Sequence, residues 1–115
     1  MMQSHALLVT DLIDHAAREH KDREIVTRWA DGSMTRSNWG EVGLNARRFA
    51  AALTRLGIGK GDRVATLAMN HEHHLVSWYG TAGKGGILHT VNPRLFDDQL
   101  RYIINHAEDR LLSLD

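Results

Sequence analysis

The second half of this 115-residue chain alternates short apolar runs with helical patterns, which strongly constrains the fold. Three runs have the length and apolar content of buried strands, and the two segments between them carry apolar residues at helical spacing. Strand–helix–strand units of this kind wind right-handed and give parallel strands with helices packed on the sheet. The sequence therefore predicts an α/β fold with a parallel βαβαβ unit, its strands at 63–69, 86–91 and 110–114.

The two helices of this unit have expected starts and faces. Asn70 is positioned to cap the first, which runs from His71 to about Gly83, and Asp97 or Asp98 opens the second. The apolar sides expected to face the sheet are Leu75, Val76, Tyr79 and Ala82 in the first helix, and Leu100, Ile103, Ile104 and Ala107 in the second.

A long amphipathic helix is predicted just before this unit. Apolar residues at 3-4-3-4-3 spacing form one stripe, made of Trp39, Val42, Ala46, Phe49, Leu53 and Leu56. Thr35 or Ser37 is placed to cap its start, and Gly57 stands where a left-handed residue ends a helix. The stripe favours a core-facing helix over a membrane- or partner-binding face.

The N-terminal part is predicted to hold a helix and a small hairpin. Thr10 is placed to cap the helix, whose apolar face contains Leu12 and Ile13. The hairpin has arms at 24–29 and 34–36 around the turn residues Asp31 and Gly32. Since no linker or repeat interrupts the chain, residues 1–115 are expected to form one compact unit.

Composition excludes several classes of function. Fourteen basic residues balance fourteen acidic ones, so no net charge draws the chain to nucleic acid or an anionic membrane. The absence of cysteine excludes disulfides, thiolate metal sites and a cysteine nucleophile. Residues 1–5 carry no Lys or Arg, and the apolar run at 6–9 is too short for a signal peptide or a membrane span. We expect a cytoplasmic protein.

Two glycine-rich stretches resemble phosphate loops but lack the required context. In a dinucleotide site a strand precedes the loop and a helix follows, and residues 57–61 have the reverse order. At 80–84, Lys84 is followed by Gly85 where a Walker loop has Ser or Thr. Residues 57–61 are therefore interpreted as a turn, and residues 80–84 as a helix terminus followed by a close backbone turn.

The run His71-Glu72-His73-His74 is the one candidate metal cluster in the sequence. A zincin helix needs its second histidine at position 75, which is Leu75. His71 and His74 could share one face of a helix, so a histidine-based metal binder stays open as one possible function of the chain. We interpret the run as a solvated first helical turn.

The remaining polar residues suggest no catalytic centre. The acidic pairs 97–98 and 108–109 are interpreted as caps and solubility charges, and His89 and Asn92 as packing residues near strand ends. No catalytic, cofactor-binding or metal-binding residue is predicted.

Three stretches nevertheless resemble the N-terminal part of adenylate-forming (AMP-binding) enzymes, most closely the medium- and long-chain fatty acyl-CoA synthetases. The stretches are Met34–Trp39 with Ala46–Leu53, Leu56–Ala65, and Gly86–Leu95 with Ile104–Asp109. The resemblance covers about residues 7–115, and it departs from the family at Arg36, where an aromatic residue is usual.

The resemblance implies a partial N-terminal domain of an acyl-CoA ligase. Such an enzyme converts a fatty acid, ATP and CoA to acyl-CoA, AMP and pyrophosphate through an acyl-adenylate, assisted by Mg²⁺. The family's phosphate loop and catalytic residues have no counterpart in this chain, so we expect it to bind no cofactor and to be inactive alone. The implied partners are the rest of its own chain and a second copy. The alternative is a stand-alone, non-enzymatic α/β scaffold or interaction module.

Overall fold

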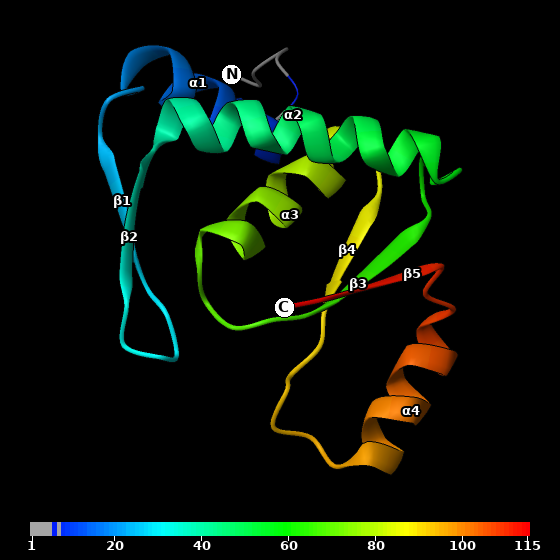
Figure 1. Ribbon diagram of the computed structural model, residues 1–115. Coiled ribbons are helices and arrows are strands. Elements are labelled where there is room, and N and C mark those ends of the chain that lie inside the picture. The colour runs from blue at the N-terminus through cyan, green and yellow to red at the C-terminus, as the bar shows by residue number, and fades with distance from the viewer. Residues whose placement is uncertain (1–5, 7) are drawn as a thin grey trace, which may run out of the picture.

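The computed structural model describes residue 6 and residues 8–115. The prediction that residues 1–9 form no signal peptide therefore falls mostly outside the described residues. Along the chain the elements are α1 (Val9–Glu19), β1 (Glu24–Arg28), β2 (Met34–Asn38), α2 (Trp39–Arg55), β3 (Arg63–Leu67), α3 (Glu72–Gly83), β4 (Ile87–Thr90), α4 (Asp97–Ala107) and β5 (Leu111–Leu114). Figure 1 shows α2 crossing the molecule from the β1–β2 hairpin to the turn before β3.

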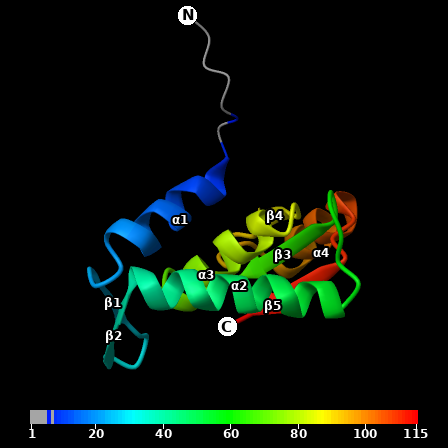
Figure 2. The same ribbon diagram turned by 90° about the horizontal axis from the view of Figure 1, so that it is seen from above.

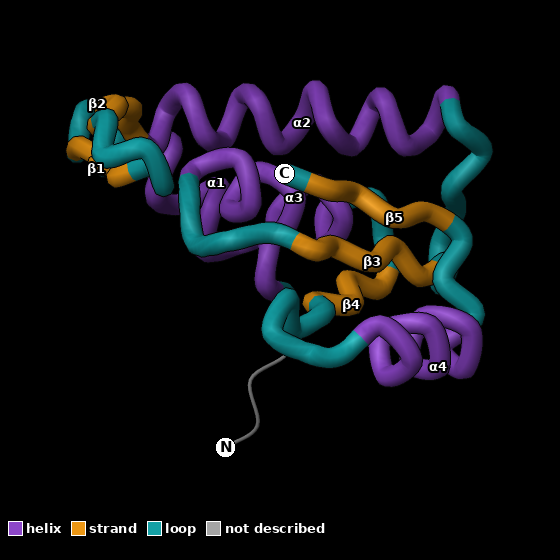
Figure 3. Tube along the Cα trace, turned by 60° about the horizontal axis from the view of Figure 1, so that its bottom comes forward, coloured by secondary structure: helices purple, strands orange, loops and turns teal. Residues whose placement is uncertain are grey.

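The predicted parallel unit is confirmed. Strands β4, β3 and β5 form one sheet in that order, and both pairings are parallel. Ala65 of β3 lies opposite His89 on one side and Leu112 on the other, so these three side chains share a face. Figure 3 shows the sheet between α2 and α4. Each strand is one or two residues shorter than predicted.

The core lies where α2 covers the sheet. Leu53, Ile58 and Val64 form a buried cluster, and Phe49 and Leu111 pack against it. The end of α2 makes this packing possible, because Gly57 takes φ +82° and the Ile58 N–H donates to the Leu53 carbonyl at 3.0 Å. The left-handed helix end predicted at Gly57 is therefore confirmed, and it folds Ile58 back onto Leu53.

The stripe predicted for α2 is largely correct. Val42, Ala46 and Leu53 are buried, whereas Leu56 is exposed because it lies beyond the last turn of the helix. The predicted cap is wrong. Asn38 caps α2, its Oδ1 accepting the Glu41 N–H at 2.8 Å.

The apolar face predicted for α3 is partly buried, but a different face of this helix is buried most deeply. Its buried residues are Ser77, Gly80 and Thr81, whereas the four expected apolar residues are only partly buried. A side chain at Gly80 would place Cβ 2.8 Å from the Ala46 carbonyl oxygen of α2. Small residues are needed here because α2 and α3 approach closely, and this selects the face of α3 that turns inward.

The start of α1 also differs from the prediction. The helix begins at Val9 with Leu8 at the cap position, so Thr10 lies inside the first turn. Ile13 is buried as expected, but Leu12 is exposed. Helix α1 contacts both α2 and α3.

The hairpin forms as predicted. Gly32 takes φ +87°, and the Asp31 carboxylate accepts hydrogen bonds from the Ser33 N–H at 2.9 Å and the Ser33 hydroxyl at 2.6 Å. The view in Figure 2 places this hairpin at the opposite end of α2 from the turn before β3.

The other side of the sheet is thinly covered. Leu100, Ile103, Ile104 and Ala107 of α4 turn inward as predicted, yet α4 has no fully buried residue. Among the described residues Ile87, Leu112 and Leu114 stay exposed on the strands. Parallel sheets are normally covered on both faces, so this surface is incomplete.

Candidate functional site

The carboxyl ends of β3 and β4 form the candidate site. From β3 the chain turns toward α3 on one face of the sheet, and from β4 it turns toward α4 on the other (Figure 3). In open α/β sheets a crevice forms where neighbouring connections diverge in this way, and ligands bind there. Residues 68–74, the start of α3 and Thr90 lie at this edge.

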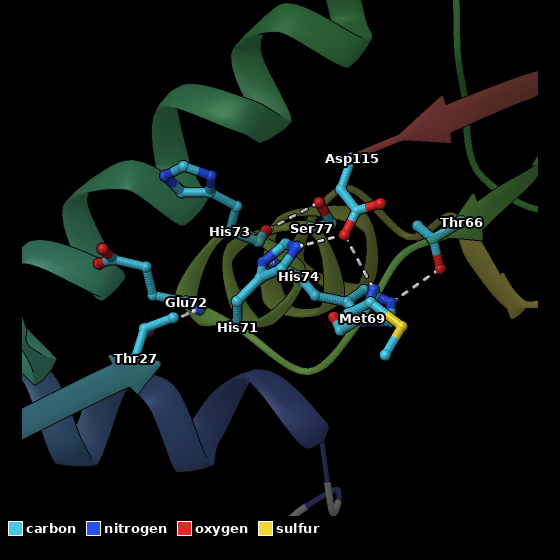
Figure 4. Close-up of polar contacts among 9 residues, drawn as sticks. All are labelled: Thr27, Thr66, Met69, His71, Glu72, His73, His74, Ser77 and Asp115. Atoms are coloured by element: carbon cyan, nitrogen blue, oxygen red, sulfur yellow. Dashed lines mark hydrogen bonds and ion pairs between the residues drawn. The ribbon is translucent and has the colours of Figure 1, made fainter. Parts of the chain in front are cut away.

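His74 connects β3 to the start of α3. His74 Nδ1 lies 3.2 Å from the Met69 carbonyl, which can only accept, so this nitrogen carries the proton. In the neutral ring, His74 Nε2 then accepts the Thr66 hydroxyl at 2.8 Å. Figure 4 shows both contacts of this side chain.

His71 is the cap of α3. Its Nδ1 accepts the His74 N–H at 3.1 Å, so Nε2 carries the proton and donates to Asp115 Oδ2 at 2.9 Å (Figure 4). Asp115 also accepts the Met69 N–H at 3.0 Å. The pKa of Asp115 is lowered first by the Met69 N–H and then by the hydrogen bond from His71.

The hairpin packs against the same helix start. The Thr27 hydroxyl accepts the Glu72 N–H at 3.1 Å, which satisfies one free amide of α3 from a distant strand. The Trp29 ring lies 4.9 Å from the His71 ring and 5.1 Å from the His73 ring. The hairpin is thereby fixed to the edge of the sheet.

These contacts correct two interpretations of the sequence. Asn70 does not cap α3, because His71 does so. The interpretation of the histidine run as a solvated turn is wrong for His71, whose side chain is only 5% exposed and whose ring nitrogens are both bonded, whereas His73 is exposed. Among the described residues no three His, Asp or Glu side chains are placed to hold a metal ion.

A cavity of about 490 Å³ opens between the hairpin and this edge. Its walls come from β1, residues 70–78 and Thr90 at the end of β4. The volume falls in the range of about 300–1,000 Å³ that is typical of small-molecule sites.

His89 has a specific partner that sequence reasoning missed. Its Nδ1 lies 2.7 Å from Asp109 Oδ2, and the Asp109 side chain is only 1% exposed. Asp109 is therefore no solubility charge, and it joins β4 to the segment after α4. Asn92 stays near the strand end, where its Oδ1 accepts the Arg94 N–H at 3.0 Å.

Neither glycine-rich stretch is built to hold phosphate. The amides of Gly57, Gly59 and Gly61 all donate within the protein, Gly59 to Asp62 Oδ2 at 2.7 Å. After α3, the amides of residues 84–86 donate to carbonyls of α3. A phosphate loop needs free amides, so the interpretation of 57–61 as a turn and of 80–84 as a helix terminus is confirmed.

Comparison with known proteins identifies the fold and the family of this chain. The solved complex of VinN with 3-methylaspartate has the same fold, with a TM-score of 0.83 at 23% identity over 94% of this chain and 29% of VinN. The fold is that of the N-terminal domain of an adenylate-forming enzyme.

A family model described as AMP-binding enzyme matches residues 13–114, and the chain belongs to this family. The 3-methylmercaptopropionyl-CoA ligase of Ruegeria lacuscaerulensis is 54% identical over 99% of this chain and 21% of that protein. The medium-chain-fatty-acid–CoA ligase of Ectopseudomonas oleovorans is 46% identical over the same shares. The chain thus spans about a fifth of the length of these ligases. Among the described residues no helix has the length and apolar character of a membrane span.

Proposed function

We propose that this chain is the N-terminal segment of an ATP-dependent fatty acid–CoA ligase of the cytoplasm. The whole enzyme would form acyl-CoA, AMP and pyrophosphate through an acyl-adenylate. The observation that carries the proposal is that 99% of the chain matches acyl-CoA ligases, of which it makes up 21%.

In this proposal the chain alone catalyses no step. Its glycine-rich turns have their amides engaged, so ATP, CoA and Mg²⁺ would be held by other parts of the enzyme. We expect no pyrophosphate release above a buffer control when the chain is incubated with ATP, Mg²⁺, CoA and a panel of fatty acids. Turnover that persists through stringent purification would contradict this expectation.

The rest of the ligase is the partner that the incomplete sheet requires. Leu112 and Leu114 are exposed on β5, which is an edge strand with one unpaired side. Apolar edge strands favour pairing with further strands. Residues 1–115 would then act as one unit that the remaining domain covers.

A chimera tests the proposal directly. The first fifth of the medium-chain ligase is replaced by this chain, and acyl-CoA formation is measured with ATP, CoA and fatty acids of several lengths. We expect activity within about tenfold of the parent ligase. As a matched control, Gly80→Leu in the chimera should abolish activity, because no side chain fits between α2 and α3.

The interaction-module alternative predicts a different outcome. A folded chimera without activity, together with a stable monomeric isolated chain, would favour it over the ligase segment. Circular dichroism establishes that the chimera is folded before its activity is compared.

A further inference from the structure

His71 holds the start of α3 through contacts that only its neutral ring can make. Its Nδ1 accepts the His74 N–H at 3.1 Å, and its Nε2 donates to Asp115 Oδ2 at 2.9 Å (Figure 4). The side chain is 5% exposed, so water reaches little of the ring. An imidazolium carries a proton on both nitrogens and accepts no hydrogen bond. Protonation of His71 therefore sets two donors, its Nδ1–H and the His74 N–H, against each other.

The neighbouring ring of His74 tolerates a second proton. Its Nδ1–H donates to the Met69 carbonyl, and its Nε2 lies 2.8 Å from the Thr66 hydroxyl. A hydroxyl both donates and accepts, so it can turn to accept from a protonated Nε2. The His74 backbone N–H cannot turn away from His71 while α3 keeps its first turn. The cap of α3 therefore depends on the charge of His71.

The charges around His71 only partly offset the loss of the cap. The titratable and charged groups that face the ring are Asp115 after β5, Arg28 of β1, and Glu72, His73 and His74 of α3. Asp115 favours an imidazolium, but its side chain is 39% exposed and also holds the Met69 N–H, so solvent weakens the attraction. Glu72 adds a negative charge at the same place. Arg28 and the positive end of the α3 dipole oppose an imidazolium here.

Two distant segments are held at the capped turn. Asp115 joins the end of β5 to the His71 ring. From the hairpin, the Trp29 ring lies 4.9 Å from the His71 ring, and the Thr27 hydroxyl accepts the Glu72 N–H at 3.1 Å. When the first turn of α3 loosens, the hairpin and the end of β5 lose their shared anchor.

We propose that the start of α3 is a pH-sensitive switch operated by protonation of His71. The neutral ring caps α3 and ties the hairpin to the edge of the sheet, and the imidazolium releases both. Asp115 stays ionised between about pH 5 and pH 8, where histidines titrate, because the Met69 N–H and the His71 ring hold its pKa below its usual value. The switch goes beyond the proposed ligase function, because it rests on contacts within this chain and needs neither ATP nor CoA.

Nitrogen-15 NMR of the chain between about pH 8 and pH 5 tests the switch. At the upper end, the ring signals should show the proton on Nε2 of His71 and on Nδ1 of His74. As the pH falls, protonation of the His71 ring should coincide with shifts of the Glu72 and His74 amides. Protection of the His74 amide from hydrogen exchange, relative to an unfolded peptide at the same pH, should fall about fivefold, as for loss of one helix cap.

Matched variants separate the switch from a general effect of acid. His71→Asn keeps an acceptor that is favoured at helix starts but does not titrate, so protection of the residue 74 amide should stay high at both pH values. His71→Ala has no acceptor, and its protection should be about fivefold lower at both. His73→Asn, at the exposed histidine of the same turn, is the control and should keep the full pH response.

Four outcomes would overturn the proposal. They are a His71 ring that carries its proton on Nδ1 at the upper pH, a His71 ring that stays neutral throughout, amide changes that follow the ring of His73 or His74 instead, and a pH response that persists in His71→Asn. No readout involves adenylation, so failure here leaves the ligase proposal standing.

Discussion

Replacing Gly80 with alanine should separate the two helices that organise the molecule. The added Cβ would lie 2.8 Å from the Ala46 carbonyl oxygen and 2.8 Å from Phe49 Cδ1. Both atoms belong to α2, so the clash is relieved only if α2 and α3 move apart.

The expected loss follows from two opposing effects. Overpacking costs about 1–3 kcal/mol, and contact with a backbone oxygen places this site in the upper part of that range. Alanine in a helix regains about 1 kcal/mol relative to glycine. Gly80→Ala should therefore lower the free energy of unfolding by about 1–2 kcal/mol, with a fall in Tm of roughly 4–8 °C for each kcal/mol.

Gly83→Ala is the matched control on the same helix. Its Cβ would lie 3.6 Å from Thr10 Cγ2, an ordinary contact, so stability should be unchanged or rise by up to about 1 kcal/mol. Urea unfolding followed by circular dichroism at 222 nm gives both free energies. Equal or greater stability of Gly80→Ala than of the unsubstituted chain would refute the close-packing argument.

Three further outcomes can be checked by similar means. The pKa of Asp62 is lowered, first by the Gly59 N–H and then by the charge of Arg110. A carboxyl whose pKa is lowered in the folded state stabilises the fold at pH values above its unfolded pKa, which is near 3.9. Stability should therefore fall as pH drops below about 4, and Asp62→Asn should weaken that dependence in acid-unfolding curves. Gly57→Ala should cost about 1–2 kcal/mol in urea unfolding because φ is +82°, whereas Gly59→Ala, whose φ is not positive, should cost less. The isolated chain should self-associate in sedimentation velocity through its exposed strands, and Leu112→Lys should weaken this; a monomer throughout the micromolar range would contradict it.

The sheet was predictable because its signals are local. Each strand is a short apolar run bounded by turn residues, and the right-handed rule then fixes parallel pairing. Gly57 was predictable for the same reason, since a glycine directly after a helical stripe marks a left-handed helix end. These features need no knowledge of distant residues.

The cap of α3 and its buried face were not predictable because neighbouring elements select them. Asn70 and His71 are adjacent, and either could cap the helix. His71 is the cap because Asp115 and the hairpin hold its ring in place. Gly80 looked like part of a helix terminus, yet close approach by α2 makes it the centre of a packing contact.

The candidate site was missed because its parts are far apart in sequence. His71 and Asp115 are brought together only when β5 pairs with β3. Asp109 appeared solvent-facing beside Glu108, and only the fold places it against His89. The useful signal for His71 and Asp115 was their position beyond the carboxyl ends of β3 and β5, which parallel topology gathers at one edge.

The strand order has a consequence for the timing of folding. Strand β3 is central, and its second neighbour, β5, begins 48 residues later at Leu111. At about 5–20 residues per second, a ribosome needs roughly 2–10 seconds to add those residues. During that interval one edge of β3 has no partner, although β4 can already pair with the other. The nascent chain is then most open to wrong strand pairing, and a chaperone that protects this edge would matter most before β5 emerges.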